Sequence, residues 1–105
     1  MDPVKVLWTR PAELRFEELR RRAVDTGNLG QFVHAHNEIV THLRDPHQAA
    51  TVGEPLYRTR LPGGEVRHWV HRFIAVTYAV FPGEQVVWIV RYQFVPESWP
   101  NLDNT

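Results

Sequence analysis

The sequence predicts an α+β domain in which an N-terminal strand and a two-helix hairpin pack on one face of a mainly antiparallel sheet. Three observations lead to this prediction. The chain has 105 residues, which suits one domain. Two amphipathic helical patterns follow each other in its first half, and its second half is rich in β-branched and aromatic residues. We therefore expect residues 1–105 to form a single domain that ends in a polar tail over residues 96–105.

The first half of the chain is expected to hold one strand and both helices. Residues 4–9 are mostly β-branched and apolar, and Pro11 then stands in the first helical turn, where proline is tolerated best. We expect helices near residues 11–25 and 29–44, because apolar residues recur there at helical spacing. The apolar faces consist of Ala12, Phe16, Leu19 and Ala23 in the first helix, and of Leu29, Phe32, Val33, His36, Ile39, Val40 and Leu43 in the second.

The second half is expected to form the sheet. Residues 53–61 are consistent with an extended stretch or an edge strand. Residues 65–81 are too long for one typical strand, so we expect two strands with a tight bend or bulge near Arg72, one long bent strand being the alternative. A turn over residues 81–84 leads to a last strand over residues 85–95. Strict alternation would place Val86, Trp88, Val90, Tyr92 and Phe94 on one face of that strand, and Val87, Ile89, Arg91 and Gln93 on the other.

Composition argues against several classes of protein. The chain has no cysteine, which removes disulfides, thiolate metal sites and cysteine nucleophiles. No apolar run approaches the roughly 20 residues that span a bilayer. The start of the sequence lacks the pattern of a signal peptide, so we expect a cytoplasmic protein with no membrane partner. Basic and acidic residues number 12 each, whereas nucleic-acid-binding proteins usually have a basic excess.

The histidines of the predicted helical region do not have the spacing of a metal site. His34 and His36 are two residues apart, so on a helix they point about 200° away from each other. His42 and His47 have no acidic residue at ligand spacing. The Gly-Gly pair at residues 63–64 lacks the Lys and Ser/Thr that follow in a phosphate-binding loop. We therefore expect neither a metal nor a cofactor.

Three segments, taken in order, resemble the toxins of the RelE/ParE superfamily. Residues 6–12 (VLWTRPA) are similar to the opening strand of that family and the start of its first helix. Residues 72–80 (RFIAVTYAV) are similar to a family strand that begins with a basic residue and carries a tyrosine near its end. Residues 86–91 (VVWIVR) resemble the closing strand that pairs with it. The resemblance covers most of residues 4–95.

This resemblance implies the toxin component of a toxin–antitoxin pair, held by a cognate antitoxin and able to arrest growth when freed. Some family members cut mRNA on the ribosome without a metal, and others inhibit DNA gyrase without cutting RNA. In the cutting members, basic residues on the open face of the sheet hold the scissile phosphate, and a His, Lys, Glu or Tyr transfers protons. A metal-independent endoribonuclease is therefore the first hypothesis. The alternatives are a non-catalytic inhibitor and a toxin-derived interaction domain.

A basic cluster stands where the resemblance places the basic residues of the family. Alternation along a strand puts Arg67 and His71 on one face, and His68 and Arg72 on the other. Guanidinium groups bind phosphate, and imidazole is the side chain best suited to proton transfer near neutral pH. We expect these four residues and Arg91 to converge, at least in part, on the open face. The alternative is a solvated strand edge.

The segment that begins at Arg91 gives a further indication. In some ribonucleolytic relatives an Arg-Tyr pair is followed by a catalytic His-Tyr pair, whereas Gln93 and Phe94 stand at those positions here. Neither can exchange a proton, so that version of the active site is absent. Tyr92 remains as a proton donor, with packing in the core as the alternative. The predicted catalytic residues are His68, His71, Arg72, Arg91 and Tyr92; the predicted RNA-binding residues are Arg58, Arg60 and Arg67, although Arg58 and Arg60 suit the flank of a turn equally well.

Large apolar residues on both faces of the last strand predict a protein partner. Val86, Trp88 and Val90 are expected opposite Val87 and Ile89. The helices can cover only one of these faces, so the other is expected to bind an antitoxin segment, as a helix or a strand.

Overall fold

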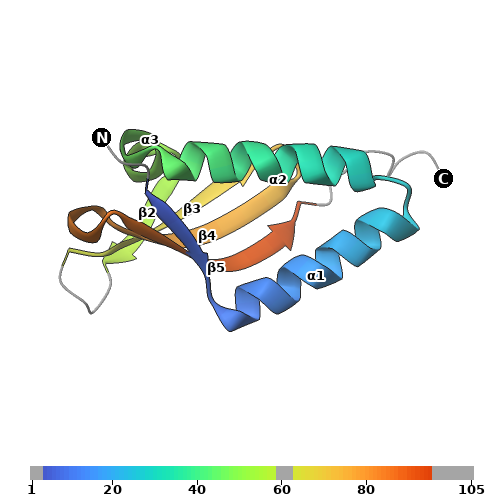
Figure 1. Cartoon of the computed structure of the whole chain (residues 1–105), viewed down its shortest axis with the longest axis horizontal. Coiled ribbons are helices and arrows are strands. Elements are labelled where there is room, and N and C mark those ends of the chain that lie inside the picture. Colours follow the sequence, from blue (N-terminus) through green and yellow to red (C-terminus); the bar gives the residue numbers. More distant parts are fainter. Residues whose placement is uncertain (1–3, 59–62, 96–105) are drawn as a thin grey trace.

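A mixed sheet packed against helices makes up the fold (Figure 1). The computed structural model describes residues 4–58 and 63–95. The strands lie in the order β1-β5-β4-β3-β2, and β1 is parallel to β5 while the other neighbours are antiparallel. In chain order the elements are β1 (Lys5–Trp8), α1 (Arg10–Asp25), α2 (Leu29–Arg44), α3 (Pro46–Thr51), β2 (Glu54–Arg58), β3 (Glu65–His71), β4 (Ile74–Phe81), the 3₁₀ turn η1 (Pro82–Glu84) and β5 (Val86–Phe94).

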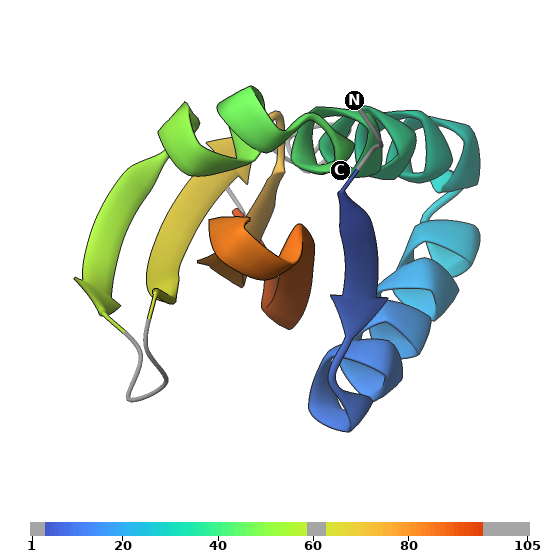
Figure 2. The same cartoon turned by 60° about the vertical axis from the view of Figure 1, so that its left-hand side comes forward.

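Both predicted helices are confirmed, and local chemistry favours the starts of α1 and α3. The Thr9 hydroxyl accepts a hydrogen bond from the Ala12 amide at 3.3 Å and so caps α1, with Pro11 in the first turn. Pro46 was expected only to end α2, but it also opens α3, which the Asp45 carboxylate caps by accepting from the amide of His47 at 2.9 Å. Figure 2 shows α2 and α3 on the same side of the strands.

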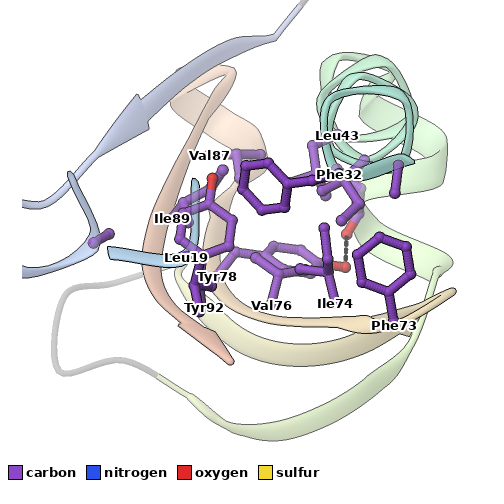
Figure 3. Close-up of a cluster of buried hydrophobic side chains, with 14 of the residues drawn as sticks. Leu19, Phe32, Leu43, Phe73, Ile74, Val76, Tyr78, Val87, Ile89 and Tyr92 are labelled. Carbon is purple, nitrogen blue, oxygen red and sulfur yellow. Dashed lines mark hydrogen bonds between the residues drawn. The ribbon is translucent and has the colours of Figure 1, made fainter. Parts of the chain in front are cut away.

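The core lies between the helices and one face of the sheet (Figure 3). The buried stripe of α2 is narrower than the sequence predicts, because Leu29 and Val33 are exposed. Tyr78 places its hydroxyl in this core, 3.1 Å from the carbonyl oxygens of Ala49 and of Val52. The strands and helices share a cluster that includes Leu19, Phe32, Ile39, Leu43, Phe73, Ile74, Val76, Tyr78, Val87, Ile89 and Tyr92.

A tight turn joins β3 and β4, as the sequence predicts, so the alternative of one long bent strand is wrong. Arg72 adopts a left-handed conformation there, with φ of 58°. The strands pair directly on either side of the turn, with His71 opposite Ile74. The positive φ matters for the site, because it redirects the Arg72 side chain.

A bulge in β5 overturns the strict alternation expected for that strand. Thr77 pairs with Arg91 and Tyr78 pairs with Ile89, so Val90 has no partner in β4. Beyond Val90, each residue of β5 lies on the face opposite to the one that strict alternation predicts. Tyr92 and Phe94 therefore join Val87 and Ile89 on the helix-covered face, while Arg91 and Gln93 lie with Trp88 on the other.

The second face of the sheet carries no helix among the described residues, and we call it the open face. It nevertheless contains buried side chains, those of Val66, Ala75 and Ala79. Within the described part of the chain, no helix combines the length and the apolar character needed to cross a bilayer.

Candidate functional site

A row of four polar side chains crosses the open face. Glu54 in β2 is directly opposite His68 in β3, His68 is opposite Thr77 in β4, and Thr77 is opposite Arg91 in β5. Side chains opposite each other in antiparallel strands share one face, with Cβ atoms roughly 5 Å apart. Nδ1 of His68 lies 3.3 Å from the Thr77 hydroxyl oxygen. We call Glu54, His68, Thr77 and Arg91 the polar row.

Gly53 allows β2 to approach β3 closely enough to form this row. It has a φ of +66°, and a Cβ atom added to it would lie 2.2 Å from the carbonyl oxygen of His68. Only glycine combines that conformation with that close contact. The close approach places the next residue, Glu54, opposite His68.

Arg67 lies on the helix-covered face, where it stabilises the segment between α3 and β2. It is 7% exposed. Its Nε donates to the Val52 carbonyl at 3.1 Å and its Nη2 to the Gly53 carbonyl at 3.3 Å. Its Nη1 lies 2.6 Å from a carboxylate oxygen of Glu65. These contacts give Arg67 a structural role in shaping the start of β2.

His71 and Arg72 both contact Glu38 of α2. Nε2 of His71 lies 3.1 Å and Nε of Arg72 lies 2.6 Å from Oε1 of Glu38. The Arg72 guanidinium, followed by the His71 hydrogen bond, lowers the pKa of the Glu38 carboxyl from 4.5 to about 2. The prediction that the five basic residues converge on the open face is therefore wrong for Arg67, His71 and Arg72. Alternation turns the first two toward the helices, and the left-handed turn redirects the third.

Tyr92 lies in the core, as the alternative interpretation expected. Its hydroxyl accepts a hydrogen bond from Nε1 of Trp8 at 2.6 Å and lies 2.7 Å from Nε2 of His36. Burial raises the pKa of Tyr92 above its ordinary value of 10. Because the Trp8 indole can only donate, Tyr92 uses its own proton toward His36, whose Nε2 then accepts in the neutral tautomer. The bulge at Val90 is what turns Tyr92 away from the open face.

The imidazole of His36 predicts an acid dependence of stability. Burial lowers the pKa of His36 from 6.5 to about 4, so the folded chain favours the neutral form. The contribution of this group is complete above the unfolded pKa of 6.5 and is lost as the pH falls toward 4. At about 1.4 kcal/mol for each pKa unit, we expect the free energy of unfolding to fall by up to about 3 kcal/mol across this window.

Urea unfolding at several pH values, on wild type and on His36→Leu, measures this dependence. We expect the variant to have a flatter profile between about pH 6.5 and pH 4, whereas replacement of the exposed His47 should leave the wild-type slope. Equal slopes for wild type and His36→Leu would show that His36 does not carry the effect. The Glu38 carboxylate loses its interactions with Arg72 and His71 only at lower pH, because its pKa in the folded chain is about 2.

The remaining predicted residues lie at the edge of the described sheet. Arg58 is exposed at the end of β2, opposite Glu65. Arg60 lies outside the described residues. No three His, Cys, Asp or Glu side chains come together as a possible metal site in residues 4–58 and 63–95. Of the eight predicted residues, the structure therefore brings His68 and Arg91 together in one row.

Glu54 and Thr77 are the members of the row that the sequence did not single out. The sequence gives one indication of Glu54, which is its place directly after a glycine at the start of a possible edge strand. Its pairing with His68 depends on the register of β2, which shifts between Pro55 and Tyr57. Thr77 alternates normally in β4, but its place beside Arg91 depends on the bulge at Val90.

An apolar row lies beside the polar row on the open face. The exposed side chains in it are Tyr57 (63%) and Trp88 (37%). Between them in register lie the smaller, buried side chains of Ala79 and Val66. In register across the sheet, the apolar row consists of Leu7, Trp88, Ala79, Val66 and Tyr57.

Two solved structures are similar to this chain. A chain of a chromosomal ParDE toxin–antitoxin system from P. aeruginosa has a TM-score of 0.57 and 21% identity, and the match covers 88% of this chain and 96% of that one. A chain of the toxin–antitoxin complex RelBE2 from Mycobacterium tuberculosis has a TM-score of 0.51 and 24% identity, with coverage of 90% and 93%. No family model and no curated protein matches the sequence. The chain has a RelE/ParE-like fold, as the sequence resemblance implied.

Proposed function

We propose that the chain is the toxin of a toxin–antitoxin pair and acts as a metal-independent endoribonuclease on mRNA. The observation that carries the proposal is the polar row, which places a carboxylate, an imidazole and a guanidinium in sequence across an open sheet face. Transfer of a phosphate from its 5′-oxygen to the neighbouring 2′-hydroxyl needs a base, an acid and positive charge. The row contains one candidate for each.

Each member of the polar row has a role in this reaction. Glu54 accepts the proton of the 2′-hydroxyl as its oxygen bonds to phosphorus. His68 donates a proton to the 5′-oxygen as the bond between phosphorus and that oxygen breaks. Arg91 stabilises the negative charge that develops on the phosphate, and the Thr77 hydroxyl orients His68. The products are a 2′,3′-cyclic phosphate and a 5′-hydroxyl end.

Growth tests this proposal at the level of function. Induction of the wild-type chain in a bacterium is expected to arrest growth and to cut mRNA, and co-expression of the small protein encoded by the neighbouring gene is expected to restore growth. The cytoplasm is the compartment in which such a protein would meet mRNA on the ribosome. Undisturbed growth with intact mRNA would leave only the fold similarity in place.

The apolar row supports a cognate antitoxin as partner. Both similar chains come from toxin–antitoxin assemblies. Trp88 is an exposed aromatic member of the apolar row, between Leu7 and Ala79, and is a suitable anchor, because aromatic residues dominate interface energetics. An antitoxin segment seated here would cover the polar row as well, and so would prevent access of RNA.

Trp88→Glu is expected to weaken antitoxin binding by at least about tenfold, because it buries a charge at an apolar anchor. Co-purification and calorimetry with the neighbouring gene product measure this loss. Val33→Glu is the matched control, since Val33 is 44% exposed on α2, away from the open face. Equal binding by both variants would show that the antitoxin uses another surface.

A non-catalytic inhibitor, for example of DNA gyrase, is the second candidate function. Gln93 and Phe94 replace a titrating pair, and Tyr92 is buried in the core. The chain also has zero formal net charge, which is unusual for a protein that binds RNA. Growth arrest without RNA cleavage would favour this candidate.

A further inference from the structure

A groove runs between α1 and the outer edge of β5. β1 pairs with β5 only as far as Trp8 opposite Ile89, so within residues 4–58 and 63–95 no strand covers the rest of β5 on this side. The cavity here has a volume of about 730 Å³. Thr9, Pro11 and Arg15 line one wall, and residues 90–93 line the other.

Two arginines, Arg15 and Arg91, line this groove, and their side chains differ in the contacts that they make. Arg15 is held by two bonds, from Nε to the Tyr92 carbonyl at 3.4 Å and from Nη1 to the Glu18 carboxylate at 2.9 Å. Its Nη2 has no hydrogen-bond partner among the described residues. Arg91 is exposed and forms no ion pair within the described part of the chain. Arg91 is also the end of the polar row, so the groove continues the open face around the β5 edge.

The edge of β5 in this groove is poorly suited to pairing with a peptide strand. The Thr9 hydroxyl lies 3.5 Å from the Val90 carbonyl, and Nε of Arg15 donates to the Tyr92 carbonyl. An added strand would have to displace both side chains to pair with these carbonyls. What the groove still offers is cationic N–H donors, which suit phosphate oxygens.

We propose that this groove binds the RNA backbone beside the cleavage site, with Arg15 and Arg91 contacting successive phosphates. The inference rests on the proposed ribonuclease function and names a binding subsite for its substrate. A strand of RNA lying across the polar row passes over Arg91 at the β5 edge and continues along α1 past Arg15. Arg15 acts in binding and takes no part in the bond-breaking step.

Arg15→Gln tests the subsite, and Arg20→Gln is its matched control. Both arginines lie on α1 and pair with a glutamate three residues away, Arg15 with Glu18 and Arg20 with Glu17. The probe is a fluorescent single-stranded RNA with 2′-O-methyl riboses, which binds but cannot be cut. Affinity is measured over a range of salt concentrations.

For Arg15→Gln we expect weaker binding and a slope of log affinity against log salt that is smaller by about 0.7, the value for one lost phosphate contact on a single strand. Arg20→Gln should keep the wild-type slope, and Arg15→Lys should retain most of it because the charge remains. Thermal unfolding of each variant shows whether the fold is destabilised by loss of the hydrogen bond to Tyr92, so that weaker RNA binding by a stable variant can be assigned to the lost phosphate contact.

One result would overturn the inference and leave the proposed function standing: wild-type RNA affinity and salt slope for a folded Arg15→Gln variant. If the same variant also bound the antitoxin more weakly, the groove would be assigned to the protein partner. If the wild-type chain neither binds the probe nor cuts RNA, the proposed function fails together with the inference.

Discussion

His68→Ala is expected to slow RNA cleavage by a factor of about 10²–10³ while leaving the fold intact. His68 lies on the open face, and the only hydrogen bond of its side chain among the described residues is the contact with Thr77. Its removal takes away the proposed proton donor for the leaving oxygen without disturbing the core. Single-turnover cleavage of a labelled RNA, together with circular dichroism of the variant, measures both parts of this expectation.

Two further variants show whether the effect belongs to the polar row. Arg91→Ala should slow cleavage by a similar factor, because it removes the positive charge that the proposed mechanism places against the phosphate. His71→Ala should cleave RNA at the wild-type rate, since His71 lies on the helix side and contacts Glu38. If His71→Ala is inactive and His68→Ala is active, the roles assigned to the two histidines are wrong.

Phe32→Ala is expected to lower the free energy of unfolding by about 3–5 kcal/mol, as truncation of a buried phenylalanine commonly does. Phe32 is 1% exposed, and its ring lies 5.4 Å from that of Phe16 and 6.1 Å from that of Phe94. Removal of the ring leaves a cavity where α1, α2 and β5 meet. Urea unfolding monitored by fluorescence measures the loss.

Leu14→Ala is the control for this prediction. Leu14 is 51% exposed on α1, so its truncation should change the free energy of unfolding by no more than about 0.5 kcal/mol. Similar losses for Leu14→Ala and Phe32→Ala would mean that the buried cluster does not hold the helices on the sheet.

The helices and most strands could be predicted from the sequence because their signals are local. The spacing of Ala12, Phe16, Leu19 and Ala23 defines one helical face, and Pro11 defines where the helix starts. The turn near Arg72 also follows from local information, since the apolar run is too long for one strand. These elements appear in the structure with bounds close to those expected.

The faces of the strands were harder to predict, because they depend on pairing between distant segments. The bulge at Val90 leaves no clear signal in an apolar strand, yet it turns Tyr92 into the core and Arg91 onto the open face. The left-handed conformation of Arg72 likewise carried this side chain away from His68.

The candidate site shows the same limit. His68 and Arg91 were identified from residue type and from the family resemblance, and the structure places both in the polar row. Glu54 was missed, because its position opposite His68 is set by the close approach of Gly53 to β3. That approach is a tertiary feature that the sequence of β2 alone does not reveal.

Analysis of the RNA ends made by the purified chain in the presence of EDTA tests the proposed chemistry most directly. With wild type we expect fragments that carry a 2′,3′-cyclic phosphate and a 5′-hydroxyl, because in the proposed mechanism Glu54, His68 and Arg91 supply the groups that this reaction needs. With His68→Ala we expect the amount of these fragments formed in a fixed time to fall by the same factor as the cleavage rate. Intact RNA with a wild-type chain that still arrests growth would contradict the ribonuclease assignment.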